Sequence, residues 1–220
     1  MLARILEPEV MDSADDAREY DAMDHSVVNA QFVIDLLAVL TDTPLQVLDL
    51  GAGTAQIPIE LARRTAQLHI TAVDAAPSML ALARTNIDSA HLSHRIDPIL
   101  ADAKSLSFAD DSFPVVISNS ILHHIADPHA VVAEAARVAS PGGLLFHRDL
   151  ARPNDEARLQ HLVDAYAGDA TPYQRKLFSG SLRAAMALEE MRDLVAEVGF
   201  GRETVQMTSD RHWTWSARKK

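Results

Sequence analysis

The sequence contains no cysteine among its 220 residues and has few basic side chains. The missing cysteines exclude disulfide bonds, thiolate metal ligands and a cysteine nucleophile, and they suit a reducing compartment. The chain carries 20 Lys and Arg against 31 Asp and Glu, a formal charge of −11 that repels nucleic-acid backbones and anionic lipid surfaces. It also lacks the roughly 18 uninterrupted apolar residues of a membrane span and the apolar core of a secretion signal. We therefore expect a soluble, cytoplasmic protein with no nucleic-acid partner and no membrane span.

The residues that are present are typical of one globular domain. Hydrophobic residues make up 48% of the chain and charged residues 23%, which fits neither disorder nor a coiled coil. A chain of this length has room for one sizeable core and not for a second large domain. We expect a single domain over residues 1–220. It should begin with an amphipathic helix at 15–41, where apolar residues recur at spacings of three and four.

Short β-prone segments alternate with helical segments from residue 46 to residue 150. Strands separated by helices in this way imply right-handed crossovers and a parallel sheet covered on both faces. Pro98 cannot donate a ladder hydrogen bond, so the third strand should lie at a sheet edge. We expect a helical cap at 151–200 and a closing antiparallel hairpin at 201–217, which completes an α/β, Rossmann-like, doubly wound sheet of seven strands. The first five expected strands are 46–50, 69–75, 95–103, 114–120 and 142–150.

The end of the first expected strand carries a glycine turn, LDLGAGTAQIP, at residues 48–58. Gly51 and Gly53 permit a tight turn and close backbone approach, and a helix from about Thr54 would direct free N–H groups at a bound anion. Asp74 ends the second strand 21 residues after Gly53. At this separation an acidic side chain can accept ribose hydroxyls. The combination predicts a ligand that contains adenosine.

Two residues near the turn bear on which adenosine ligand is bound. Gln56 occupies the third position of the G-x-G-x-x-G pattern of dinucleotide-binding enzymes, where a large side chain opposes a bound pyrophosphate. Asp49 lies in the strand just before the turn, where its negative charge would repel a pyrophosphate but could bind an ammonium group. These residues favour adenosine joined to an amino acid. A nucleotide-dependent oxidoreductase of Rossmann type remains the alternative.

The order of these motifs resembles the class I S-adenosylmethionine-dependent methyltransferases, in particular the small-molecule enzymes of ubiquinone and menaquinone biosynthesis. The family's successive motifs resemble VLDLGAGTA, TAVDAAPSMLALAR, ILADAKSLSFADDSFPVVISNSILHHIADP and VASPGGLLF, between about residues 46 and 150. Pro114 stands where the family usually has an Asp, which concerns strand pairing more than catalysis. The resemblance implies S-adenosyl-L-methionine as cofactor, S-adenosyl-L-homocysteine as product and a small-molecule methyl acceptor.

The resemblance also implies a set of cofactor-binding residues. The turn backbone would hold the methionine moiety, Asp74 would bind the ribose, and Asp102 would bind the adenine amino group. The other residues of the set would contact the adenine ring, lie near the sulfonium or cover the site. The implied set is Tyr20, Asp49, Gly51, Ala52, Gly53, Thr54, Asp74, Ala75, Met79, Asp102, Ala103 and Asn119.

Histidines after the fourth and fifth strands are candidate general bases. Methyl transfer from a sulfonium is an in-line displacement, so the protein mainly orients the reactants, and a base is needed only where the acceptor loses a proton. The candidates are His123, His124 and His147, and each could instead shape the pocket or lie in the core. Adjacent histidines do not share a helix face, and no pair at a spacing of four accompanies them. We therefore predict no metal site.

Candidate acceptor-binding residues lie in and after the fifth strand. Arg148 could clamp a carboxylate. Tyr173 and Arg175 belong to segment 166–191, which either closes over the pocket as a lid or forms a helical hairpin. A non-catalytic, cofactor-binding regulatory protein is the alternative from outside the enzymes. The sequence leaves open whether the protein is a monomer or a homodimer, and which acceptor atom is methylated.

Overall fold

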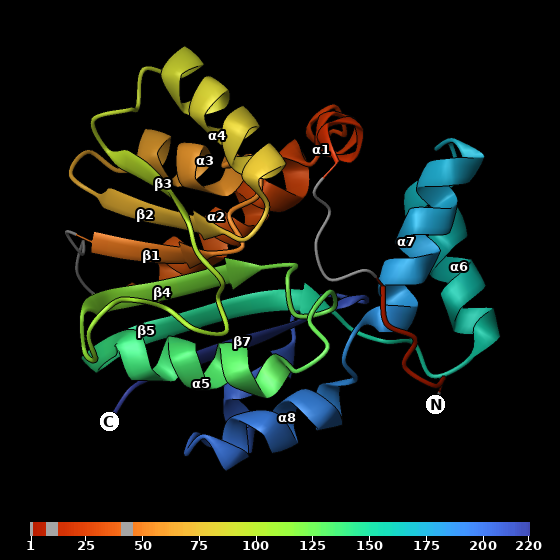
Figure 1. The fold of residues 1–220 in the computed structure, drawn as a ribbon. Coiled ribbons are helices and arrows are strands. Elements are labelled where there is room, and N and C mark those ends of the chain that lie inside the picture. Colours follow the sequence, from red (N-terminus) through yellow and green to blue (C-terminus); the bar gives the residue numbers. More distant parts are fainter. Residues whose placement is uncertain (1, 8–12, 41–45) are drawn as a thin grey trace.

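The computed structural model describes residues 2–7, 13–40 and 46–220, and seven strands within them form a mixed sheet in the order β3-β2-β1-β4-β5-β7-β6 (Figure 1). Strands β1 to β5 are parallel, and β7 runs antiparallel to its neighbours β5 and β6. This confirms the expected doubly wound sheet with a closing hairpin. The bounds are β1 Gln46–Leu50, β2 His69–Asp74, β3 Ile96–Leu100, β4 Phe113–Asn119, β5 Ala139–Leu150, β6 Val205–Met207 and β7 His212–Arg218.

Two prolines coincide with an edge strand and with a register shift in the sheet. Strand β3, which contains Pro98, lies at one edge as predicted, where the missing N–H group has no neighbouring acceptor to satisfy. Pro114 lies inside β4, and the register with β5 shifts between Phe113 and Val115. Proline cannot donate to the ladder, so the irregular pairing falls where this chain departs from the family pattern.

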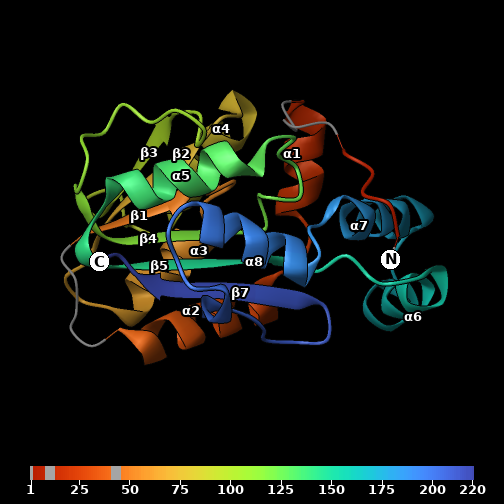
Figure 2. The ribbon, with the colours of Figure 1, turned by 90° about the horizontal axis from the view of Figure 1, so that it is seen from below.

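Helices cover both faces of the sheet, with α5 and α8 on one side and α2 on the other (Figure 2). One core packs α2, α3 and α4 against the strands, and a second packs α5 and α8 against the opposite face. None of the helices in the described residues is long and apolar enough to cross a membrane. The bounds are α1 Ala14–Asp21, α2 Ser26–Val39, α3 Gln56–Arg64, α4 Pro77–Ser89, α5 Pro128–Val138, α6 Glu156–Ala167, α7 Pro172–Ala184 and α8 Leu188–Glu197, with a short 3₁₀ helix at Arg202–Thr204.

Helix boundaries differ from the sequence prediction at two places. The helix expected at 15–41 is divided into α1 and α2, because the Asp24 side chain accepts a hydrogen bond from the Ser26 N–H (2.9 Å) and begins a new helix there. Residue 41 lies outside the described residues. Helix α3 begins at Gln56 and not at Thr54, since Ala55 has the left-handed φ of 65° that precedes it. In the cap, α7 and α8 are separate helices.

The N-terminal segment 2–7 connects the cap to the loop after β4. Helices α6 and α7 pack against each other beyond the carboxyl ends of the parallel strands (Figure 1). The Arg4 guanidinium donates to the carbonyl of Ala184 at the end of α7 (2.7 Å) and to the carbonyls of Leu122 (3.1 Å) and Ile125 (3.0 Å). The beginning of the chain therefore reaches the side of the sheet on which the candidate site lies.

Candidate functional site

A cavity of about 170 Å³ lies at the carboxyl ends of β1, β2 and β4. Open α/β sheets bind their ligands at this end. Three of the predicted cofactor-binding residues, Asp49, Ala52 and Thr54, are not part of its lining. The predicted residues that do line it are Tyr20, Gly51, Gly53, Asp74, Ala75, Met79, Asp102, Ala103, Asn119 and His124.

Asp74 and the glycine turn form one hydrogen-bonded unit. Oδ2 of Asp74 accepts from the N–H of Gly53 and Oδ1 accepts from the N–H of Ala76, both at 2.8 Å. The Gly51 N–H donates to the Val73 carbonyl at 2.9 Å. The φ angles of Gly51 (73°) and Gly53 (54°) are ones that glycine adopts without strain. The acid and the turn are therefore held in a fixed relation at the ends of two neighbouring strands.

Two carboxyl groups lie close to the cavity, Asp49 buried behind the turn and Asp74 half-buried in the lining. Asp49 is 2% exposed. Burial, and then the charge of Asp74, raise the pKa of Asp49 well above its usual range. Burial also raises the pKa of Asp74, although its backbone hydrogen bonds oppose the shift. A cationic ligand would relieve this repulsion, whereas a pyrophosphate would increase it.

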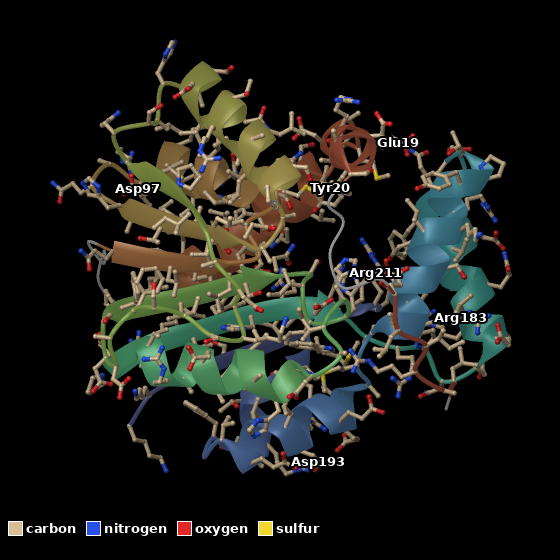
Figure 3. The ribbon with its side chains drawn as sticks, in the orientation of Figure 1. Glu19, Tyr20, Asp97, Arg183, Asp193 and Arg211 are labelled. Carbon is tan, nitrogen blue, oxygen red and sulfur yellow. The ribbon has the colours of Figure 1, made fainter. Side chains whose placement is uncertain are left out.

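Tyr20 reaches the cavity from α1, which lies beyond the strand ends (Figure 3). Its Cε1 atom is 3.9 Å from the position that a Cβ on Gly53 would take. The ring centroids of Tyr20 and His25 lie 5.1 Å apart. The tyrosine therefore lies close to the glycine turn, as the family resemblance implies.

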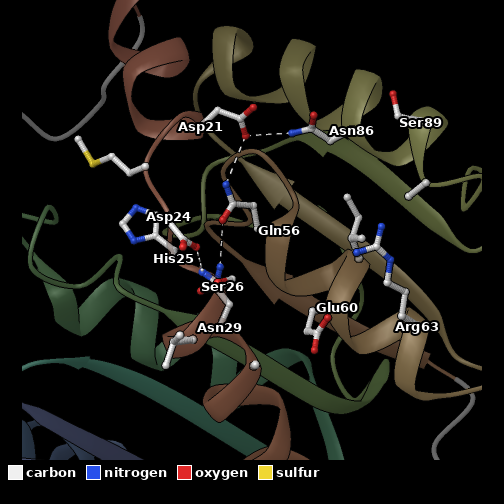
Figure 4. Close-up of a pocket in the computed structure, with 15 residues that line it drawn as sticks. Asp21, Asp24, His25, Ser26, Asn29, Gln56, Glu60, Arg63, Asn86 and Ser89 are labelled. Atoms are coloured by element: carbon white, nitrogen blue, oxygen red, sulfur yellow. Dashed lines mark hydrogen bonds between the residues drawn. The ribbon is translucent and has the colours of Figure 1, made fainter.

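A chain of polar side chains holds α1 at this position (Figure 4). Oδ1 of Asp21 accepts from Nδ2 of Asn86 on α4 (3.0 Å) and from Nε2 of Gln56 on α3 (3.4 Å). Oε1 of Gln56 in turn accepts from Nδ2 of Asn29 on α2 (3.0 Å). The network borders a separate surface hollow of about 730 Å³, which shares no lining residue with the cavity beside Tyr20. The side chain of Gln56 thus fixes the N-terminal helices, a role that the glycine pattern did not predict.

His123 and His124 lie in the loop after β4. His123 Nδ1 is 2.6 Å from Oδ1 of Asp149 on β5, and the His123 backbone N–H donates to Oδ2 of the same carboxylate (3.1 Å). Burial alone would lower the pKa of His123, but the Asp149 carboxylate raises it above its usual value. His124 lines the cavity, and burial together with His123 lowers its pKa to about 3. The two imidazoles therefore differ in proton affinity although they are adjacent.

His147 does not reach the cavity. Its side chain is buried, its ring lies 5.1 Å from that of Trp215, and neither ring nitrogen has a hydrogen-bond partner in the described part of the chain. Burial lowers its pKa to about 3. The structure therefore does not support the predicted role of His147 as a base.

Arg148 points to the opposite face of the sheet. Its Nε donates to Oγ1 of Thr214 (2.9 Å) and its Nη2 to Oδ2 of Asp35 on α2 (2.7 Å). The guanidinium also lies 5.6 Å from the ring centroid of Phe32. The predicted acceptor clamp is therefore not supported, because these contacts engage the side chain between α2 and the sheet.

The two acceptor candidates on α7 also lie outside the cavity lining. Tyr173 is 48% exposed. Arg175 donates to Oδ1 of Asp164 on α6 (2.5 Å) and to the Ala167 carbonyl (3.1 Å). These contacts join α6 to α7 as a helical pair, and closure of segment 166–191 over the site stays a prediction.

Sequence analysis missed Glu7. Its Oε2 lies 3.7 Å from Nδ1 of His124, and it accepts a hydrogen bond from Ser181 Oγ on α7 (3.1 Å). No local pattern connects a carboxylate near the start of the chain to a histidine more than a hundred residues later. Only the path of segment 2–7 across the cap brings them together.

Comparisons with known proteins find methyltransferases among the proteins that this chain is similar to. A sequence profile of a methyltransferase domain matches residues 48–147. The chain is 28% identical over 135 residues to the ubiquinone/menaquinone biosynthesis C-methyltransferase UbiE of Roseobacter denitrificans. The match covers 61% of this chain and 54% of the relative, so the chain spans about half the length of that protein. It is 26% identical over 213 residues to UbiE of Nitrobacter hamburgensis, which covers 88% of this chain and 83% of the relative.

The fold has a similar counterpart among solved structures. A protein of Methanococcus maripaludis assigned as an S-adenosyl-L-methionine-dependent methyltransferase superposes with a TM-score of 0.74. The two are 18% identical, and the match covers 98% of this chain and 97% of the other. The profile, the relatives and the fold agree, and the chain is similar to the class I S-adenosylmethionine-dependent methyltransferases, in particular to their UbiE-like group.

Proposed function

We propose that this protein transfers the methyl group of S-adenosyl-L-methionine to a small-molecule acceptor. The observation that carries the proposal is the cavity in which Tyr20, the glycine turn and Asp74 meet at the strand ends. When bound, the cofactor supplies a methyl group already activated on a sulfonium, so its displacement requires orientation more than further activation.

The charges and shapes around the cavity fit this cofactor. Asp74 accepts from the turn at Gly53 with Oδ2 and from Ala76 with Oδ1, and the remaining lone pairs of the two oxygens suit the two ribose hydroxyls. Ala75 and Met79 give the neighbouring lining an apolar surface for a ring. The buried charge of Asp49 behind the turn favours the ammonium and sulfonium groups and disfavours a dinucleotide. The oxidoreductase alternative is therefore not favoured.

Cofactor binding should move the loop after β4. The cavity volume of about 170 Å³ is below the 300 to 1,000 Å³ typical of small-molecule sites. The Ile121 side chain lies over Gly51 so closely that a Cβ added there would collide with it. Ser120, just before it, has a left-handed φ of 61°. We propose that Ile121 moves outward as the cofactor enters and then closes over the methionine moiety.

We propose that the acceptor meets the methyl group near the two histidines of the loop after β4. His124 faces the cavity beside Asn119, and the buried Asp149 carboxylate fixes the ring of His123. We propose that these imidazoles hold or accept the acceptor proton where the acceptor has one to lose. The acceptor, the cytoplasmic location and the oligomeric state stay predictions.

Parallel calorimetric titration tests the proposal. The purified chain would be titrated with S-adenosyl-L-methionine, S-adenosyl-L-homocysteine, NAD and NADP under one set of conditions. We expect micromolar binding of the two sulfur compounds and no binding of the dinucleotides. Dinucleotide binding without binding of the sulfur compounds would refute the assignment. Binding without turnover across an acceptor screen would favour a regulatory protein.

A further inference from the structure

Three side chains that can bind a metal come together beside the cofactor cavity. They are Glu7 from the N-terminal segment and His123 and His124 from the loop after β4, and one candidate ligand atom from each lies within 4.8 Å of the other two. His124 lines the cavity, while Glu7 lies between that loop and α7. The prediction of no metal site considered only sequence spacing among the histidines and therefore did not include Glu7.

The separation of Glu7 and His124 suits a shared ion better than a hydrogen bond. Oε2 of Glu7 and Nδ1 of His124 are 3.7 Å apart, beyond ordinary hydrogen-bond range. Two ligands about 2.1 Å from one tetrahedral ion lie roughly 3.4 Å from each other. The Nδ1 atom of His124 is buried and has no hydrogen-bond partner in the described part of the chain. A small shift would let both atoms bind one ion.

Asp149 prepares His123 to act as a ligand. The Asp149 carboxylate lies 2.6 Å from Nδ1 of His123, which places the proton on that nitrogen and leaves Nε2 as the free electron-pair donor. Metal-binding histidines usually donate their other ring N–H group to a carboxylate or carbonyl in this way, which fixes the ring and raises its basicity.

Glu7 is also held in place by neighbouring groups. Ser181 Oγ donates to the Glu7 carboxylate, and Gly180 has no side chain at the point where a Cβ would collide with it. Arg4, three residues earlier, binds the Leu122 carbonyl just before His123. The cap and the loop therefore fix the N-terminal carboxylate beside the two imidazoles.

We propose that Glu7, His123 and His124 bind one divalent transition-metal ion, with Zn²⁺ as the reference ion. Two imidazoles and one carboxylate with an open position form the ligand set of catalytic zinc and non-haem iron sites. Partial exposure of the His124 and Glu7 side chains, 24% and 18%, gives the ion a path to the site.

The ion deepens the proposed function by selecting an oxygen acceptor, and this part rests on that function. A hydroxyl oxygen of the acceptor would take the open position and release its proton to water, because a bound cation lowers its pKa. The new O–CH₃ bond then forms as the S–CH₃ bond breaks, and the electron pair stays on sulfur. In this arrangement the two imidazoles serve as ligands and not as bases, and the ion promotes loss of the acceptor proton by lowering the pKa of the bound hydroxyl.

Metal titration of the full chain tests the site. Protein treated with a chelator would be titrated with Zn²⁺ by calorimetry, and with Co²⁺ while visible absorption is recorded. We expect one Zn²⁺ per chain and the intense bands of four- or five-coordinate Co²⁺. Loss of an outer-shell partner typically weakens a metal site 10- to 100-fold, so we expect that range for Asp149→Asn and at least about 100-fold for Glu7→Gln. His124→Gln provides a second ligand variant, and circular dichroism checks each fold.

The exposed His129 on α5 provides the matched control. His129→Gln should leave Zn²⁺ affinity and the Co²⁺ spectrum unchanged. Equal affinities in wild type, Glu7→Gln and His129→Gln would overturn the site and assign the binding to surface histidines, as would the absence of saturable binding. Titration with S-adenosyl-L-methionine separates the metal site from the proposed function. If Glu7→Gln loses Zn²⁺ binding but still binds S-adenosyl-L-methionine, both proposals are supported. If the wild type binds Zn²⁺ but not S-adenosyl-L-methionine, only the proposed function is refuted.

Discussion

Replacing Asp74 by Asn should weaken binding of S-adenosyl-L-methionine without unfolding the protein. The carboxylate makes two backbone hydrogen bonds of 2.8 Å, to Gly53 and Ala76, on opposite oxygens. Asparagine has a single acceptor oxygen, so one of these N–H groups would face an NH₂ group instead. The substitution therefore removes the ribose-binding charge and one of the two contacts, either to the glycine turn at Gly53 or to Ala76 before α4.

The size of the loss follows from the number of charged hydrogen bonds. A hydrogen bond to a charged group contributes about 1.5 to 3 kcal/mol, and each 1.4 kcal/mol is tenfold in affinity. Loss of the charge at the ribose should therefore raise Kd roughly 10- to 150-fold. Burial raises the pKa of Asp74, so part of the binding energy between this carboxylate and the ribose only offsets the desolvation of the carboxylate. This limits how much affinity the substitution can remove.

Calorimetric titration of Asp74→Asn with S-adenosyl-L-methionine measures this loss, and thermal unfolding checks that the variant is folded. Asp97→Asn is the matched control, because Asp97 is exposed on the neighbouring edge strand β3 (Figure 3). The control should bind like wild type. If Asp74→Asn binds within a factor of two of wild type, Asp74 does not hold the ribose and the assignment of the cavity is wrong.

Three further substitutions test the buried polar groups. Asp49→Asn should stabilise the free protein by about 0.5 to 2 kcal/mol near pH 7, because burial raises the pKa of Asp49 and makes its charge costly there. Thermal unfolding should show this gain shrink as the pH falls and disappear below about pH 3, where aspartate is protonated in both the folded and the unfolded chain. Calorimetry should show weaker cofactor binding. Asp21→Ala should raise the cofactor Kd about fivefold by releasing Tyr20, and an unchanged Kd would exclude this positioning role. Arg148→Ala should lower the free energy of unfolding in urea by about 1 to 3 kcal/mol, since it removes one hydrogen-bond partner each from Asp35 and Thr214. An effect on cofactor affinity alone would contradict its structural role.

The cofactor half of the site could be predicted from the sequence because its signals are local. A glycine turn, an acidic residue after the next strand and the alternation of strands with helices each occupy a few neighbouring residues. Parallel strands then bring their carboxyl ends to one edge, which places Gly51, Asp74 and Asn119 around one cavity. For these residues, the strand topology predicted from the sequence is enough to place them together.

The acceptor half could not be predicted in this way. Successive residues of β5 point to opposite faces, so His147 and Asp149 share one face and Arg148 lies on the other, but the sequence does not say which face continues into the cavity. Only Asp149, nearer the strand end, meets His123. Helix boundaries failed for a similar reason, because the polar contact that begins α2 at Ser26 interrupts an otherwise helical pattern.

The two halves of the cavity therefore have different origins in the chain, and this bears on how specificity is set. Residues 48–147, which match the methyltransferase profile, supply the turn and the acids that suit the cofactor. Tyr20 and Glu7 come from before this region. Asp21, next to Tyr20, accepts hydrogen bonds from α3 and α4, and Glu7 accepts one from α7. Substitutions in the N-terminal segment can thus alter the acceptor side while the hydrogen bonds between Gly53 and Asp74 stay intact. We therefore propose that acceptor choice in this protein depends on the N-terminal residues and on the cap that holds them.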